Sequence, residues 1–395
     1  MSGESPPSEP LYIWQLPDWP KFSWSAQALA PTLRACQQAQ GRLLGMVDAA
    51  ARDDQAQSEL DALLQNIVTS SAIEGERLNV ESVRSSLARR LGVAGEPKRP
   101  ATARSEGLAE LTLDATQNVD APLDLARLLH WHQLLFPEQE SILPMHVRVG
   151  SLRADEPMQV VSGRVDRPTV HFEAPPRKGL EPQLDAFLTW FNTSRDDTAM
   201  DPLLRAGIAH FWFVTLHPFD DGNGRLTRTI TDRALAQGES QAIRFYAMSS
   251  SILDDRKGYY HILETSQKGS LDITAWLEWF LRTLLASLRQ ALGHIDRELS
   301  KARFWQEHRS QSLLPEQLKV INRLLDGGDR AFEDGITASK YQAVAKVSKA
   351  TATRHLADLL EKGLLVQLPG GGSKTRYQVA IASSTVRGQS NYSAP

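Results

Sequence analysis

The residues with the clearest chemical potential form one short segment from His217 to Arg228, which reads His-Pro-Phe-Asp-Asp-Gly-Asn-Gly-Arg-Leu-Thr-Arg. The segment follows an apolar helical pattern and opens another helical pattern at 223–237. Gly222 and Gly224 allow a ligand to approach the backbone closely and permit unusual dihedral angles. The N-terminus of the following helix presents free N–H groups and a positive dipole end, and both favour an anion.

Charged side chains complete this segment. Arg225 and Arg228 are three residues apart on the predicted helix, so both can reach the same anion. Asp221 offers a hard oxygen ligand that suits Mg²⁺ between phosphates. His217 precedes the loop and titrates near neutrality, as a general base should. The segment therefore predicts a phosphate-binding loop that carries its own metal ligand and its own base.

The segment resembles the signature of the Fic family, His-Pro-Phe-x-(Asp/Glu)-Gly-Asn-Gly-Arg-x-x-Arg, and every fixed position matches. A motif fixed at so many positions between two helices is far more specific than a glycine fingerprint alone. The resemblance covers residues 11 to about 300. It implies the Fic/Doc fold and a protein adenylyltransferase (AMPylase), a nucleotidyltransferase that uses ATP and Mg²⁺ to modify a Ser, Thr or Tyr hydroxyl of a target protein.

The resemblance also implies a role for each position of the segment. His217 would take the proton from the target hydroxyl as it attacks the α-phosphorus, and pyrophosphate would leave. Asp221 would hold Mg²⁺ on the α- and β-phosphates. The nucleotide-binding residues implied by the resemblance are Phe219 as the anchor of the loop, Gly222, Asn223 and Gly224 at the α-phosphate, Arg225 at the β-phosphate, Arg228 at the γ-phosphate, and Tyr259 and Tyr260 beside the adenine.

A second motif precedes this segment, at the end of a predicted helix over 54–73. Ser70 and Glu74 are four residues apart and share a face. The string Ser-x-x-x-Glu-Gly matches the inhibitory motif of Fic proteins that have an N-terminal inhibitory helix. That resemblance implies a salt bridge from Glu74 to Arg228 that blocks the γ-phosphate, because a carboxylate competes well for the same guanidinium. In some relatives the equivalent glutamate serves AMP removal, so a deAMPylating enzyme remains an alternative.

Two β-like runs, 158–161 and 169–172, flank Ser162 and Gly163 and predict a hairpin around a glycine turn. This hairpin matches the family's flap, which pairs with an extended target segment by strand addition. The edge positions we expect for the flap are Val160, Val161 and Val170.

The last part of the chain changes character. Helical patterns at 315–325, 337–347 and 349–362 precede a β-ribbon over 364–379, which is the order of a winged helix. Between 337 and 379 there are seven Lys/Arg and two Asp/Glu, a local +5 in a chain of net charge −3. That local charge suits DNA phosphates. A DNA-binding transcriptional regulator with a Fic core as sensor is therefore an alternative function, although winged helices also serve protein contacts.

Together these patterns predict a mainly α fold: a Fic-type helical bundle with a small β-hairpin flap, plus a C-terminal winged helix. The predicted divisions are a disordered tail at 1–10, an N-terminal helical region with the inhibitory helix at 11–100, the Fic core at 101–310, the winged helix at 311–381, and a disordered tail at 382–395.

The composition of the chain indicates the compartment in which the protein works. The chain has 395 residues, one cysteine and net charge −3, which leaves no disulfide framework within one chain and no global attraction to nucleic acid or membrane. The first ten residues lack the basic and apolar regions of a secretory signal, and no stretch approaches the ~20 apolar residues of a membrane span. We therefore expect a cytoplasmic protein, and the resemblance adds a homodimer that also modifies itself.

Overall fold

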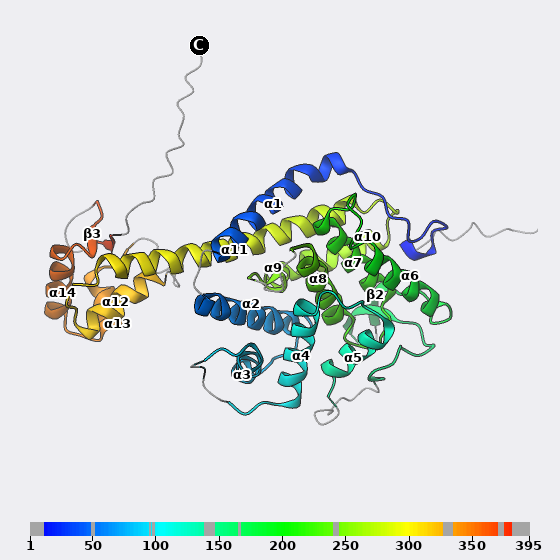
Figure 1. The fold of residues 1–395 in the computed structure, drawn as a ribbon, viewed down its shortest axis with the longest axis horizontal. Coiled ribbons are helices and arrows are strands. Elements are labelled where there is room, and N and C mark those ends of the chain that lie inside the picture. Colours follow the sequence, from blue (N-terminus) through cyan, green and yellow to red (C-terminus); the bar gives the residue numbers. More distant parts are fainter. Residues whose placement is uncertain are drawn as a thin grey trace, which may run out of the picture. The chain divides into compact units, whose positions relative to one another are not determined.

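The computed structural model describes residues 12–48, 52–94, 96, 99–137, 147–164, 167–239, 245–326, 335–369 and 375–380. It is mainly helical, as predicted, and its strands form two small antiparallel pairs (Figure 1). The chain divides into two compact units, Met1–Ala291 and Leu292–Pro395. The predicted tails, 1–10 and 382–395, lie outside the described residues.

Two helices at the centre of the first unit carry the segment singled out above. Helix α7, Pro202–Leu216, begins with Asp201, whose carboxylate accepts from the backbone N–H groups of residues 203 and 204. Its residues from Leu203 onward are all buried, as expected of a helix that is apolar on every face. Helix α8, Asn223–Glu239, packs against it. The loop between the two helices is therefore held at the centre of this unit.

The remaining helices of the first unit surround this pair (Figure 1). The sequence predicts most of them, but it misses α3 and α9. Their bounds are α1 Ala26–Asp48, α2 Arg52–Ile73, α3 Val80–Leu91, α4 Ala103–Gln117, α5 Leu125–Leu135, α6 Leu180–Thr193, α9 Met248–Asp254, α10 Arg256–Gln267 and α11 Thr274–Glu307, the last of which contains the division between the units.

The predicted hairpin is present as β1, Gln159–Arg164, and β2, Arg167–Glu173. The prediction of a turn at Ser162 and Gly163 is wrong, because both residues lie within β1. The register moves from Val160 opposite Phe172 to Val161 opposite Val170, so His171 is the extra residue of a β-bulge.

An aromatic arm near the N-terminus packs against the base of this hairpin. It includes a 3₁₀ turn, η1, Ile13–Gln15. The indole N–H of Trp14 donates to the carbonyl of Glu173 at 2.7 Å, and the Tyr12 ring meets Phe172 edge-on at 5.2 Å. The arm thus buries apolar surface at the end of β2.

The second unit contains α12 Pro315–Leu325, α13 Ala338–Ala345, α14 Lys349–Glu361, β3 Leu365–Gln367 and β4 Tyr377–Val379. This is the predicted order of three helices followed by a β-ribbon. Its core is separate and includes Tyr341, Leu356 and Leu365. Ile336 pairs with Tyr377 of β4, which adds a third backbone segment to the ribbon.

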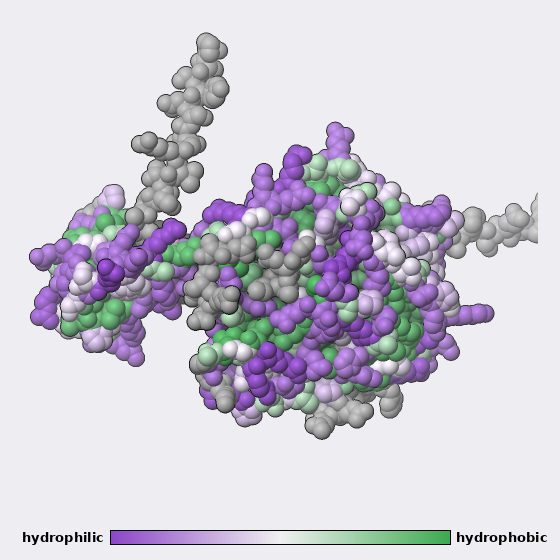
Figure 2. Space-filling view, viewed as in Figure 1, coloured by the Kyte–Doolittle hydropathy of each residue, from purple (hydrophilic) through white to green (hydrophobic). Residues whose placement is uncertain are grey.

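The face of the molecule shown in Figure 2 carries mostly hydrophilic residues, with smaller hydrophobic areas between them. Within the described ranges, no helix combines the length and the apolar character needed to cross a membrane.

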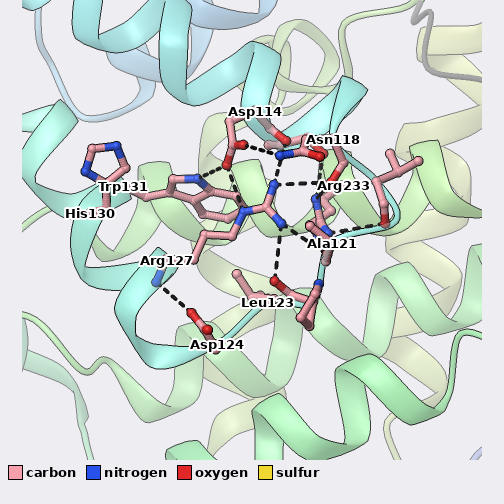
Figure 3. Close-up of polar contacts among 12 residues, drawn as sticks. Asp114, Asn118, Ala121, Leu123, Asp124, Arg127, His130, Trp131 and Arg233 are labelled. Atoms are coloured by element: carbon pink, nitrogen blue, oxygen red, sulfur yellow. Dashed lines mark hydrogen bonds and ion pairs between the residues drawn. The ribbon is translucent and has the colours of Figure 1, made fainter.

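Two arginines fasten α4, α5 and α8 together (Figure 3). The Nε of Arg127 and the indole N–H of Trp131 both donate to Asp114, at 2.8 and 2.7 Å. Burial by itself would raise the pKa of Asp114, but these hydrogen bonds hold it below its usual value. Arg233 of α8 is fully buried and donates to the carbonyls of residues 118, 119 and 121, which follow α4. The second half of α8 is thereby fixed against its neighbours.

Replacing Arg233 with Met should lower the free energy of unfolding by about 2 kcal/mol, because the partly buried carbonyls after α4 lose the hydrogen bonds from its guanidinium. Arg195→Met is the matched control. Arg195 donates to the same loop, at Val119 and Asp120, but its side chain is 31% exposed. We expect a loss below about 1 kcal/mol for this control. Urea unfolding followed by circular dichroism measures both, and equal losses would contradict the role given to Arg233.

Candidate active site

The loop between α7 and α8 begins with a residue in an unusual backbone conformation. His217 caps the C-terminus of α7 with φ 49° and ψ 57°, a left-handed conformation that costs about 1–2 kcal/mol for a side chain with a Cβ. Buried Arg153 compensates, since its Nε donates to the His217 carbonyl at 2.8 Å and its backbone N–H donates to the Pro218 carbonyl at 3.0 Å. The backbone of His217 is thus held in a conformation that ends the helix and turns its ring toward the loop.

The ring of His217 has a defined proton arrangement. Its Nδ1 lies 2.9 Å from the carbonyl of Val214, and a carbonyl can only accept, so Nδ1 carries the hydrogen. In the neutral ring Nε2 then holds the free lone pair. Burial lowers the pKa of His217 below its ordinary value, which favours this neutral form near pH 7. The residue is therefore prepared to accept a proton at Nε2.

The loop is closed by contacts among its own residues. The Asn223 amide donates to the Phe219 carbonyl at 2.7 Å and accepts from the Phe219 N–H at 3.0 Å. Phe219 is fully buried and stacks on His132, with ring centroids 4.2 Å apart. Gly222 has φ +82°, and a Cβ there would strike the ring of Phe136. Phe219, Gly222 and Asn223, all expected at the phosphates, thus give the loop its shape.

His132 extends this support to the neighbouring backbone. Its Nδ1 accepts from the Gly150 N–H at 3.0 Å, so Nε2 carries the proton and donates to the Asp221 carbonyl at 3.1 Å. This role could not be predicted from the sequence, because His132 lies on a distant helix and its contacts depend on the fold.

Two buried arginines lie beside the loop. Arg225 is 6% exposed and Arg228 is 3% exposed. Among the described residues, neither the Nε of Arg225 nor the Nη1 of Arg228 has a hydrogen-bond partner, although both atoms are buried. Buried donors of this kind are costly unless an acceptor arrives, so the pair is suited to bind a polyanion.

At present carboxylates occupy both arginines. Glu74 follows the end of α2, and its Oε1 lies 2.8 Å from the Arg228 Nη2. The same guanidinium donates to the hydroxyl and the carbonyl of Ser70, at 2.8 and 2.9 Å. Burial alone would raise the pKa of Glu74, but the charge and hydrogen bond of Arg228 lower it, so the carboxylate is ionised near neutrality. Ser70, Glu74 and Arg228 therefore meet in one place.

A second carboxylate, Glu76, forms an ion pair with Arg225. Its Oε2 accepts from the Arg225 Nη1 at 2.9 Å, and its other oxygen pairs with Arg104. The sequence analysis missed Glu76, and the only signal for it was its position two residues after Glu74. One short segment after α2 thus places a carboxylate on each of the two arginines.

Gly224 explains how Glu74 fits so close to the helix. A Cβ at residue 224 would clash with the Glu74 carboxylate and lie 3.2 Å from the Arg228 Nη1. The space left by the missing side chain is therefore an anion cradle at the N-terminus of α8.

Asp221 lies on the exposed side of the same loop. Its side chain is 54% exposed, and its Oδ1 accepts from the Gly222 N–H at 2.5 Å. Within the described residues, no three His, Cys, Asp or Glu gather to hold a metal. A single carboxylate suits Mg²⁺ that arrives with a nucleotide, since this ion takes one or two carboxylates together with phosphate oxygens and waters.

Residues of this loop and Glu74 face a cavity of about 610 Å³, which is within the range of small-ligand sites. His217, Asp221 and the loop up to Gly224 form one side of it, and Glu74 projects into it. Residues of β1, β2 and α10 line the rest.

The site residues predicted outside the 217–228 segment do not all line the cavity. Val160 and Val161 line the cavity, whereas Val170 does not and is 36% exposed on the hairpin. Tyr260 donates weakly to Glu74, at 3.4 Å. Tyr259 also lines the cavity, but it is buried and its hydroxyl lies 2.9 Å from the Nε2 of His210 in the core.

Comparisons with known proteins identify a family match and several relatives. Residues 122–235 match the Fic/DOC family, and residues 12–93 match a domain of unknown function, DUF4172. The chain is similar to the protein adenylyltransferase Fic of Nematostella vectensis, at 28% identity over 53% of this chain and 45% of that protein. Its similarity to the protein of the same name from Drosophila mojavensis is also 28%, over 53% of this chain and 38% of that protein. The chain thus spans less than half the length of these curated relatives.

The fold has a counterpart among solved structures. A Fic family protein from Desulfovibrio desulfuricans G20 superposes with a TM-score of 0.50 at 19% identity, over 93% of this chain and 99% of that chain. This likeness concerns the fold alone.

The contacts at Arg228 predict a coupling between stability and anion binding. Glu74→Ala removes the counter-ion of a buried guanidinium and should lower the free energy of unfolding by about 3 kcal/mol. Inorganic tripolyphosphate should restore stability to this variant more than to the parent protein, because it reaches both arginines without displacing a carboxylate from Arg228. Thermal unfolding with increasing tripolyphosphate measures the effect.

Glu110→Ala is the control, because Glu110 pairs with Arg90 at 3.0 Å away from the cavity. This variant should respond to tripolyphosphate like the parent. Equal gains for the parent and Glu74→Ala would show that Glu74 does not occupy the anion site.

Proposed function

We propose, on the premise that residues 122–235 form a Fic/DOC family domain, that this chain transfers AMP from ATP to a hydroxyl group of a protein. The observation that carries the proposal is that His217 and the Gly224 cradle line one cavity, while Arg225 and Arg228, two buried arginines with donors unused among the described residues, follow the cradle on α8. The relatives named protein adenylyltransferase Fic support the same reaction.

In the proposed complex the triphosphate lies along the N-terminus of α8. Gly222 and Gly224 leave room for the α-phosphate against the helix N–H groups, and the Asn223 amide keeps the loop in that shape. Arg225 binds the β-phosphate and Arg228 the γ-phosphate, where they neutralise the charge of the leaving pyrophosphate. Tyr259 and Tyr260 line the same cavity on the side proposed for the adenine.

The chemical step needs a base and an in-line acceptor. A Ser, Thr or Tyr hydroxyl of the target gives its proton to the Nε2 of His217 as its oxygen bonds to the α-phosphorus. The bond from that phosphorus to the bridging oxygen of the β-phosphate breaks, and pyrophosphate leaves. Mg²⁺, when bound at Asp221, supplies charge neutralisation between the α- and β-phosphates. The hairpin of β1 and β2 would align the target by pairing with it as an added strand.

We also propose that Glu74 holds the protein in a resting state. Its carboxylate fills the Gly224 cradle and occupies Arg228, so the γ-phosphate has no place to bind productively. Glu76 adds the same obstruction at Arg225. Activation then requires the end of α2 to move, with Ser70, Glu74 and Glu76 leaving together.

Glu74→Gly should raise AMP transfer at least tenfold, because the γ-phosphate gains Arg228 and the cradle. His217→Ala in the same background should lower transfer by a factor of ~10²–10⁴ while nucleotide binding persists. Incubation with ATP labelled on the α-phosphate and a cell lysate, followed by mass spectrometry, measures transfer. Persistent transfer to lysate proteins by the His217 variant would refute the base assignment. Release of AMP from labelled protein that requires Glu74 would instead favour a deAMPylating enzyme.

The second unit suggests a further activity, DNA binding. The first half of α14 and the turn before it expose Lys346, Lys349 and Arg354, and none of them has an ion-pair partner among the residues described. The acidic Asp358 lies farther along the helix and pairs with Lys362 at 2.8 Å. Positive charge therefore gathers at the end of α14 that a winged helix would present to the phosphates.

Replacing Lys349 and Arg354 together with Ala should weaken binding to DNA from upstream of the chain's own coding sequence. The slope of log affinity against log salt should fall by about 2, because two phosphate contacts are lost. Gel-shift titrations at several salt concentrations, with and without ATP, measure this. The control removes Arg309 and Lys319, two exposed cations outside α14. Equal effects of both pairs, or no retardation by the intact chain, would exclude a specific role for α14.

A further inference from the structure

The hairpin beside the cavity carries a second arrangement of catalytic side-chain types. The Oγ of Ser162, on β1, lies 2.6 Å from the Nε2 of His171, on β2. The Nδ1 of the same ring lies 2.9 Å from the Oε2 of Glu264, on α10. Neither contact could be predicted from the sequence, because the three residues come from separate elements.

The β-bulge accounts for the position of His171. As the extra residue opposite Val160 and Val161, it is released from the regular alternation of the strand. Its ring can therefore contact both a neighbouring strand and α10. A regular strand would place residues 170 and 172 on one face and 171 on the other, with no freedom to adjust.

The positions of the hydrogens on the His171 ring follow from the groups that it contacts. The other oxygen of Glu264 accepts from Lys268 at 2.7 Å, and this hydrogen bond is the main reason why the pKa of Glu264 lies below its usual value. The ionised carboxylate can only accept, so the Nδ1 of His171 carries a hydrogen. In the neutral ring Nε2 accepts from the Ser162 hydroxyl. A nucleophile, its base and a group that orients the base are thus in hydrogen-bond contact.

The location of this group connects it with the proposed nucleotide site. Ser162, His171 and Glu264 all line the 610 Å³ cavity that contains His217 and Gly224. Ser162 is exposed, so its hydroxyl is open to this space. Thr169, which faces Ser162 across the hairpin, is also an exposed hydroxyl residue, yet it does not line the cavity and has no histidine partner.

We propose that Ser162 is an acceptor of AMP from ATP bound in the same chain, with His171 as its base, and this inference rests on the proposed AMP transfer. The Ser162 Oγ bonds to the α-phosphorus and its proton passes to the Nε2 of His171. The bond from the α-phosphorus to the bridging oxygen breaks and pyrophosphate leaves. The product is an AMP ester on the hairpin itself.

This modification would limit the enzyme's own activity. Val160 and Val161 adjoin Ser162 on β1, the strand proposed to pair with the target. An AMP group on Ser162 adds bulk and negative charge beside that edge. The modified chain would therefore accept target segments less readily, which gives the reaction a negative feedback.

The experiment uses the full chain with Glu74→Gly and ATP labelled on the α-phosphate. Peptide mapping by mass spectrometry should find AMP on Ser162, with a rate constant that does not change with protein concentration. His171→Gln should lower the rate at Ser162 on the order of a hundredfold, because Gln keeps a hydrogen bond but takes no proton. His217→Ala should keep the label at Ser162 and lose the labels on lysate proteins.

Ser162→Ala should remove the label from this peptide, and Thr169→Ala should retain it. Labelled lysate proteins without AMP on Ser162 would overturn the inference and leave the proposed function standing. A label at Ser162 that survives His171→Gln, or that disappears with His217→Ala, would overturn the role of His171. A rate constant that rises with protein concentration would overturn transfer within one chain. Absence of AMP from every protein would reject both the inference and the proposed function.

Discussion

A buried guanidinium needs an anion beside it, and Arg228 imposes this requirement on the structure around it. The side chain is almost fully buried, and its charge cannot be left unpaired at acceptable cost. The end of α2 answers this requirement with Glu74, and the missing side chain of Gly224 gives the carboxylate room. The same requirement makes the site ready for a phosphate, because removing one anion leaves a demand for another. In the function we propose, inhibition and substrate binding are two ways to satisfy one buried charge.

The loop before α8 is held in shape mainly by hydrogen bonds to its backbone groups. His217 has a left-handed backbone, and Arg153 secures it by donating to the carbonyls of residues 217 and 218. Asn223 and His132 close the remaining turn. A base held this way has little freedom to rotate, which favours proton transfer along one direction. The price is a loop that tolerates little change in its supporting residues.

Much of the fold could be predicted from the sequence, because local signals were strong. The bounds of α8 and α12 agree closely with the patterns at 223–237 and 315–325. Helix α3 was missed even though Asn79 caps its start and Gly92 ends it, since it is short and follows a glycine break. The motif residues from 217 to 228 were found by their fixed spacing. Glu76 and the Ser162, His171 and Glu264 group were not, because their contacts join positions far apart in the chain and no spacing rule describes them.

Glu74 belongs to the same chain as Arg228, and this limits the kinds of signal that can separate the two side chains. A tethered carboxylate competes at an effective concentration that dilution does not change, on the order of millimolar or higher for a short connection. A freely diffusing nucleotide cannot easily exceed such a competitor by abundance alone. A small displacement of the end of α2, however, lowers the effective concentration of both Glu74 and Glu76 at once. With Glu74 inhibiting as we propose, the protein is better suited to respond to a displacement of α2 than to a change in nucleotide supply.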